Sequence, residues 1–163
     1  MNTIEFIRSG LESSKNWACT LLDDMRETPL VEPTPHGGNH PLWVLGHLIV
    51  SESFLLDQCL QGKPNRFPEY AELFGAGSTP VADASKYPAY DEIRPLFDQI
   101  RQDTLALLDT LSEDDLDQAS HHTENPFFST VGNCFQAMIM HTMNHSGNVT
   151  DARRAAGKPP LMI

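Results

Sequence analysis

The sequence predicts an all-α protein in which four long helices form one four-helix bundle. Four segments carry apolar side chains at the three- and four-residue spacing of a buried helix face, and few segments alternate like strands. The chain has 163 residues, with 40% apolar and 20% charged residues, so it can bury a core without disulfide bonds. We therefore expect a single bundle domain over residues 1–163.

The first expected helix begins near Asn2 and Thr3 and ends before Pro29. Its buried stripe follows the alternating four- and three-residue spacing of a helix face and consists of Ile4, Ile7, Leu11, Ser14, Ala18, Leu21 and Met25. We expect this amphipathic helix to place its stripe in the bundle core.

The second expected helix follows Asn39 and His40, either of which can cap it, and has Pro41 in its first turn. It runs to the turn at residues 62–64. Its apolar side chains occupy two faces, one with Trp43, His47, Val50 and Phe54, the other with Leu42, Leu45, Ile49, Leu56 and Leu60. A helix that is apolar on two faces must be covered on both, so we expect one face in the bundle and the other against a second subunit or the following crossover.

The connection over residues 62–90 is rich in proline and glycine and is too long for a tight antiparallel turn. The second and third helices could therefore run parallel, joined by a crossover.

The third expected helix begins around Asp91, with a stripe of Ile93, Phe97, Ile100, Thr104, Leu107 and Leu111. The acidic run at 112–117 is typical of a helix N-terminus capped by Ser112. The fourth helix runs from about Ser129 to Ala156, where Gly157 ends it. Its stripe consists of Val131, Phe135, Met138, Thr142, His145, Val149 and Ala152.

Charge and composition exclude several classes of function. The 22 acidic and 11 basic residues give a net charge of −11, which repels phosphate backbones and argues against nucleic-acid binding. No segment approaches 18 consecutive apolar residues, and the first residues lack the pattern of a signal peptide, so we expect no membrane partner. Three widely spaced cysteines without a CxxC motif are typical of free thiols in a reducing cytoplasm.

Histidines at four-residue spacing are the main functional signal. His141 and His145 lie within the fourth helix, where this spacing places side chains about 5 to 6 Å apart at Cβ, a chelating geometry. The pair His36 and His40 has the same spacing but spans two glycines in an expected loop. A lone core histidine is commonly explained by one hydrogen bond, but two adjacent core imidazoles are harder to satisfy without a metal. His47, on the core side of the second helix, is the third candidate ligand.

Other side chains receive structural interpretations. His121 and His122 could approach the site from the loop before the fourth helix, but solvated loop histidines are the simpler interpretation. Cys134 is expected to be a small core residue. Three methionines of the fourth helix are expected to pack against its neighbours: Met138, Met140 and Met143.

The stretches NHPLWVLGHL (39–48) and HTMNHSGNVTDARRAAGKPP (141–160) resemble the DinB/YfiT-like family of metal-dependent helix bundles. The resemblance implies an up-down-down-up bundle, usually dimeric, with a long crossover between helices two and three. It also implies a three-histidine site for zinc, nickel or a related divalent ion, and it assigns the ligands to His47, His141 and His145. Asn148 departs from the family pattern, because many relatives have glutamine there.

The resemblance further implies a metal-dependent enzyme acting on a small molecule. Relatives include thiol-dependent S-transferases and an isomerase, so a low-molecular-weight thiol is an expected co-substrate, and a hydrolase-like activity is also compatible with an open metal site. Asn144 and Asn148 are candidates for contacts around the ligands or the substrate, or simply polar helix surface. Two other functions remain open: a bundle that binds a metal and a small ligand without catalysis, and a purely structural helical dimer.

Overall fold

The computed structural model describes residues 1–35 and 37–161, and no strand occurs in that part of the chain. The all-α prediction is therefore confirmed. The four long helices are α1 (Thr3–Asp24), α2 (Pro41–Ser53), α4 (Tyr90–Leu108) and α5 (Val131–Ala155). A short α3 (Ala71–Phe74) and four 3₁₀ turns lie between them, at Pro68–Tyr70, Ala84–Lys86, Glu113–Asp117 and Pro126–Phe128.

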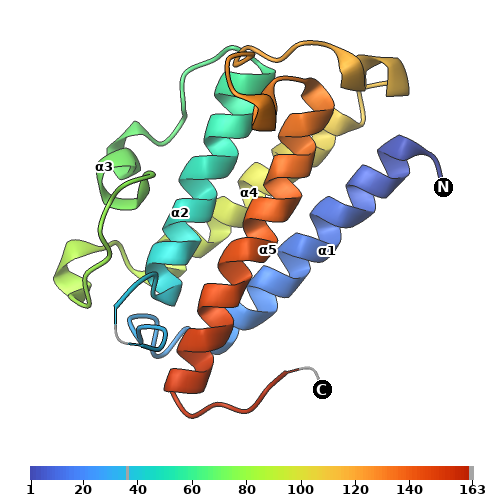
Figure 1. Cartoon of the computed structure of the whole chain (residues 1–163). Helices are drawn as coiled ribbons and strands as arrows, with labels where there is room; N and C mark the ends of the chain where they lie inside the picture. The colour runs from blue at the N-terminus through green and yellow to red at the C-terminus, as the bar shows by residue number, and fades with distance from the viewer. Residues whose placement is uncertain (36, 162–163) are drawn as a thin grey trace.

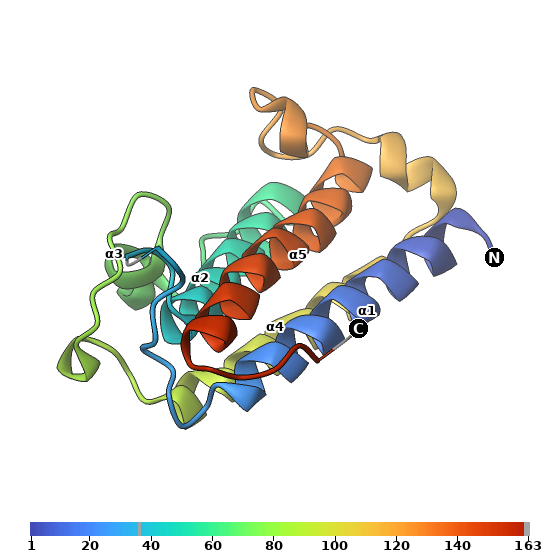
Figure 2. The same cartoon turned by 60° about the horizontal axis from the view of Figure 1, so that its bottom comes forward.

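The long helices lie side by side (Figures 1 and 2). In Figure 1, α1 and α5 run downward, whereas α2 and α4 run upward. The segment over residues 61–89 leaves the top of α2 and returns to the bottom of α4, so these two helices run in the same direction. The segment over residues 112–130 crosses the end of the bundle at which α4 ends and α5 begins (Figure 2).

Side-chain caps set the helix starts close to where the sequence placed them. The Asn2 side chain accepts the Glu5 N–H at 2.8 Å, and the Glu5 carboxylate accepts the Asn2 N–H at 2.9 Å. These reciprocal bonds form a capping box at the start of α1. His40 caps α2, because its Nδ1 accepts the Trp43 N–H at 3.1 Å. The expected helix start at Ser112 is a capped 3₁₀ turn.

The two apolar faces of α2 are both covered. Every α2 residue except Ser51 is buried. One side packs against α4 and α5, and α3 lies along the other side (Figure 1). Gly46 allows this contact, because a Cβ there would lie 2.4 Å from the Phe74 ring. The crossover therefore fulfils one of the two expectations for this face, and a second subunit stays a prediction.

Beyond Ser53 the second helix changes its hydrogen-bonding register. Residues Phe54–Leu60 form a π-helix, which the sequence prediction treated as continuous α-helix. Its backbone hydrogen bonds join residues five apart instead of four, and such π turns are frequent at functional sites. None of the described helices is both long and apolar enough to cross a membrane.

Candidate metal centre

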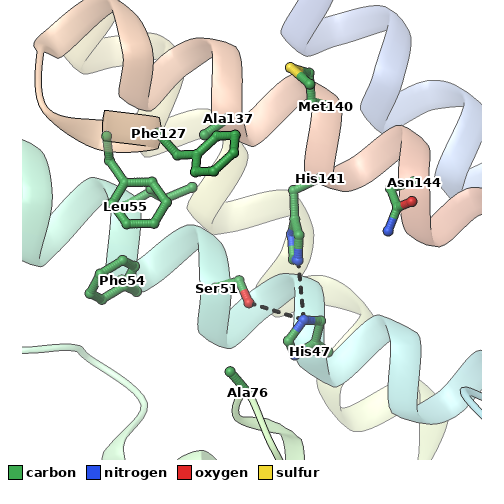
Figure 3. A pocket seen from close by; sticks show the side chains of 11 residues that line it. His47, Ser51, Phe54, Leu55, Ala76, Phe127, Ala137, Met140, His141 and Asn144 are labelled. Atoms are coloured by element: carbon green, nitrogen blue, oxygen red, sulfur yellow. Dashed lines mark hydrogen bonds between the residues drawn. The ribbon is translucent and has the colours of Figure 1, made fainter. Parts of the chain in front are cut away.

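Three histidine side chains converge between α2 and α5. His47 projects from the middle of α2, and His141 and His145 project from successive turns of α5. The Nε2 atom of His141 lies 3.1 Å from Nε2 of His47 and 3.1 Å from Nε2 of His145. Ligand atoms of all three residues lie within 4.8 Å of one another. Figure 3 shows His141 pointing across the interhelical space at His47.

The two nitrogen–nitrogen distances at His141 fit ligands of one shared metal ion. Zinc–nitrogen bonds of about 2.0–2.1 Å place tetrahedral ligand atoms about 3.3 Å apart, and octahedral neighbours about 3.0 Å apart. The observed contacts of 3.1 Å lie between these values. Three imidazoles without a carboxylate or thiolate suit zinc and nickel among other divalent ions, and leave at least one coordination position for a ligand.

Hydrogen bonds on the far side of two rings orient their lone pairs inward. The His47 Nδ1–H donates to the Phe74 carbonyl at 2.6 Å, and the His145 Nδ1–H donates to the Asn148 Oδ1 at 3.1 Å. A neutral imidazole carries one N–H, so Nε2 of both rings presents a lone pair. A proton on His141 Nε2 can serve one of its two neighbours at a time. A cation satisfies all three nitrogens together, which is the usual arrangement of metal-binding histidines.

Burial keeps the three rings in the neutral form that binds metals. Desolvation, together with the neighbouring His145 and His47, lowers the pKa of His141 to about 3. Desolvation and His47 lower the pKa of His145 to about 4, although the hydrogen bond to Asn148 opposes the shift. Desolvation also lowers the pKa of His47. Protons therefore do not compete with a metal ion at these nitrogens near neutral pH.

The crossover contributes directly to the position of His47. Trp43 stacks on the His47 ring with centroids 4.5 Å apart and an interplanar angle of 13°. The indole N–H donates to the Ser78 Oγ at 3.0 Å. Ser78 and Phe74 both belong to the 61–89 segment, so this segment fixes both the Trp43 ring and the tautomer of His47. Sequence reasoning assigned it no role at the site.

A cavity of about 510 Å³ opens beside His47 and His141. Seven of its eleven lining residues are apolar, and these seven come from the π-helix, the crossover, the 126–128 turn and α5. Ser51 and Asn144 are the polar side chains beside the histidines (Figure 3). Because the cavity reaches two of the three converging histidines, a small molecule inside it can approach the same point as the ion.

The other histidines singled out in the sequence lie outside the cluster. His121 is exposed, and His122 pairs with the Glu124 carboxylate at 3.0 Å. The His122 ring also contacts Phe54, with centroids 5.1 Å apart. His40 is buried at the start of α2, where it bonds the Val81 carbonyl at 3.0 Å. His36 lies outside the described residues.

The prediction for the sulfur-containing residues is partly wrong. Cys134 is fully buried, as expected of a small core residue, and Met138 is buried as well. Met140 and Met143, however, are 58% and 45% exposed. They lie about 200° and 140° from Met138 around the helix, so the periodicity that buries Met138 turns them away from the core. Met140 instead lines the cavity.

Comparison with known protein families decides the classification. The family model of the DinB superfamily matches residues 17–149 of the chain. The chain belongs to the DinB superfamily. This confirms the resemblance seen in the two sequence motifs, and the matched region contains all three histidines. A comparison with curated proteins finds no match.

In this DinB-superfamily chain, Asn148 takes a defined place beside the cluster. Besides accepting from His145, its Oδ1 accepts a hydrogen bond from the Asn39 Nδ2 at 3.4 Å. The side chain therefore connects a ligand candidate of α5 to the loop before α2. Asn144 lines the cavity but is exposed. Of the two asparagines, Asn148 contacts a histidine of the cluster.

A buried ion pair beneath the site was missed by sequence reasoning. Arg101 donates to both carboxylate oxygens of Glu52, at 2.6 and 2.8 Å, and both side chains are at most 4% exposed. The same guanidinium donates to the Leu11 carbonyl and, at 3.2 Å, to the Thr142 hydroxyl beside His141. One charge cluster thus joins all four long helices. Glu52 does not line the cavity, and no sequence signal named Arg101 as its partner.

Proposed function

We propose that this protein is a metal-dependent enzyme acting on a small molecule, of the thiol-dependent S-transferase or isomerase type. His47, His141 and His145 would hold one divalent ion, with zinc and nickel the leading candidates. The observation that supports this best is the meeting of three Nε2 atoms, two of them backed by Nδ1 hydrogen bonds, at the end of an open cavity. Membership of the DinB superfamily supports the same function.

A divalent ion bound by these residues would act as a Lewis acid and lower the pKa of a coordinated water or thiol. The chain supplies the surroundings. The Ser51 hydroxyl lies 3.5 Å from the His47 Nε2, within reach of a group that shares the site with that nitrogen. Apolar side chains such as Phe54 and Phe128 exclude water from the cavity wall. The thiol would be a separate small molecule, because the three cysteines are buried and do not line the cavity.

Elemental analysis tests the metal directly. Protein purified without added metal should contain about one divalent ion per chain, as expected for a three-histidine site. His47→Ala and His145→Ala should each lower the metal content severalfold. His121→Ala is the matched control, because it removes an exposed histidine outside the cluster. Equal metal content in all four proteins would contradict the assignment of the ligands.

Turnover separates catalysis from binding. Metal-loaded protein should accelerate conjugation of an electrophile with a low-molecular-weight thiol, and the His47→Ala variant should not. A small ligand that raises the melting temperature but is recovered unchanged would instead favour a non-catalytic binding bundle. A structural role would be favoured by two results together: the wild-type protein contains no metal, and His145→Ala lowers the stability only as much as an ordinary core substitution.

The remaining assignments follow from the resemblance and the composition. We propose one DinB-like domain over residues 1–163, with the up-down-down-up topology, that forms a homodimer. Light scattering at micromolar concentration tests the dimer, and a monomer would contradict it. We further propose a cytoplasmic location, which the three free cysteines support.

A further inference from the structure

The cavity beside the histidines is polar at one end and apolar at the other. His47, His141, Ser51 and Asn144 lie at one end (Figure 3). From His47 to Phe54 the helix rises by about 10 Å, and the lining in that direction is aromatic and aliphatic. A ligand that fills the cavity therefore has one polar end beside the histidines and an apolar body.

No lysine, arginine, aspartate or glutamate is among the described residues that line this cavity. A carboxylate or phosphate at the apolar end would lose its hydration without gaining a cationic partner, which is unfavourable. The net charge of −11 adds a long-range repulsion of anions. The cavity therefore disfavours binding of a ligand whose body carries a charge.

The rim of the cavity carries apolar side chains that are open to solvent. Phe127 and Met140 line it and are 73% and 58% exposed, so their apolar surfaces face solvent on one side and the cavity on the other. Ala137 lies between them on the wall, where its small side chain leaves the space open (Figure 3). Phe127 belongs to a 3₁₀ turn of three residues, whereas Ala137 and Met140 are fixed on α5.

We infer that the substrate class of this site is a small molecule with one electron-pair donor at the histidine end and an uncharged aromatic or aliphatic body. A compact polyanion such as a dicarboxylate is excluded. The donor end of this inference rests on the proposed function, because it assumes an ion between the histidines. The part of the inference that concerns the body of the ligand depends only on the residues of the cavity wall.

Two thiols that differ only in their bodies test the inference. Cobalt-loaded protein is titrated with benzyl mercaptan and with mercaptosuccinate, and the sulfur-to-cobalt charge-transfer absorption reports binding. Benzyl mercaptan should bind more tightly by about tenfold to a hundredfold, the gain from burying one phenyl ring. Equal affinity, or tighter binding of mercaptosuccinate, would overturn the inference.

Variants of the wall provide the structural test. Ala137→Trp fills the apolar end and should weaken benzyl mercaptan binding at least about tenfold without changing cobalt affinity. Ala155→Trp is the matched control, because it adds the same side chain at an exposed position of α5. Phe127→Lys should be tolerated by the fold, since Phe127 is mostly exposed, and should shift the preference toward mercaptosuccinate. An unchanged preference in both cavity variants would contradict the assigned body end.

Failure of the proposed function is distinguishable from failure of this inference. If the protein does not retain cobalt, the metal proposal fails, and the body end is tested on metal-free protein with toluene. Saturation-transfer NMR should then detect toluene binding in the wild type and in Ala155→Trp, but not in Ala137→Trp. If cobalt binds and the two thiols are not distinguished, the metal proposal stands and the inference about the substrate is wrong.

Discussion

The ion pair of Glu52 and Arg101 is buried where the four long helices meet, so removing one partner alone should be costly. Arg101 is 1% exposed, and two of its hydrogen bonds are to the Glu52 carboxylate, at 2.6 and 2.8 Å. Glu52→Met leaves the guanidinium with neutral partners only. Breaking a buried pair in this way costs about 3–5 kcal/mol. For a chain of this length we expect a fall in melting temperature of about 6–20 °C.

Removing both partners should be far less harmful. In Glu52→Met/Arg101→Met no charge is left in the core. The hydroxyls of Thr104 and Thr142 keep the backbone carbonyls of Ile100 and Met138 as acceptors, at 2.9 and 2.8 Å. Replacement of a buried pair by apolar side chains of similar size is often neutral. We therefore expect the double variant within about 1 kcal/mol of the wild type.

Urea denaturation of the four proteins of this cycle measures the coupling. The midpoint and the slope are fitted together, so a change in the denatured state is not mistaken for a change in stability. The reasoning is refuted if each single variant loses less than about 1 kcal/mol, or if the double variant loses the sum of the two single effects.

Three further predictions concern the surroundings of the histidine cluster. The pKa values of His141 and His145 are lowered to about 3 and about 4, so below pH 6.5 the unfolded chain binds protons at these residues before the folded chain does. The free energy of unfolding of the metal-free protein should therefore fall by up to about 1.4 kcal/mol per pH unit for each histidine. Urea midpoints that stay constant from pH 6.5 to 5 would contradict this. Gly46→Ala should lower the free energy of unfolding by about 1–3 kcal/mol and weaken metal binding, because the new Cβ would displace the buried Phe74 ring. Gly147→Ala has open space at its Cβ and should stabilise α5. Thermal unfolding measures the stability and a chelator competition the metal affinity, and equal effects of the two variants would refute the argument. Asn148→Ala should weaken metal affinity by about 10- to 100-fold, because it removes the hydrogen-bond acceptor of His145. Asn148→Gln should retain more of the metal affinity. A chelator competition that gives the wild-type affinity for both variants would exclude a role of Asn148 in metal binding.

Local signals account for what the sequence predicted well. Helix starts depend on residues within one turn, as at Asn2 and His40, and the buried stripes follow from helical periodicity. The convergence of His141 and His145 was predictable because both lie on one helix with a four-residue spacing. His47 was reached because its helix phase places it with apolar neighbours. The exposure of Met140 and Met143 was also predictable from phase, and the error came from interpreting them by hydrophobicity alone.

Contacts between distant segments account for what the sequence did not predict. Glu52 and Arg101 are separated by 49 residues and lie on different helices, so no spacing rule connects them. The π-helix from Phe54 to Leu60 is rich in apolar residues, as is the α-helix before it, so composition does not separate the two. The packing of Phe74 over Gly46 depends on a crossover segment without periodicity, which gives no sequence signal for the residue that it places nearest to α2.

The crossover also explains why His47 can act together with two residues of another helix. His141 and His145 share α5, and their relative position is set by helical geometry. His47 depends instead on a ring that stacks on it and a carbonyl that fixes its tautomer, and both require the 61–89 segment in place. Because the Phe74 carbonyl accepts from Nδ1 while the Phe74 ring packs on Gly46, the same residue closes the outer face of α2 and directs the Nε2 lone pair inward. The long connection is therefore part of the histidine site, and shortening it should affect metal affinity before it affects the packing of the four long helices.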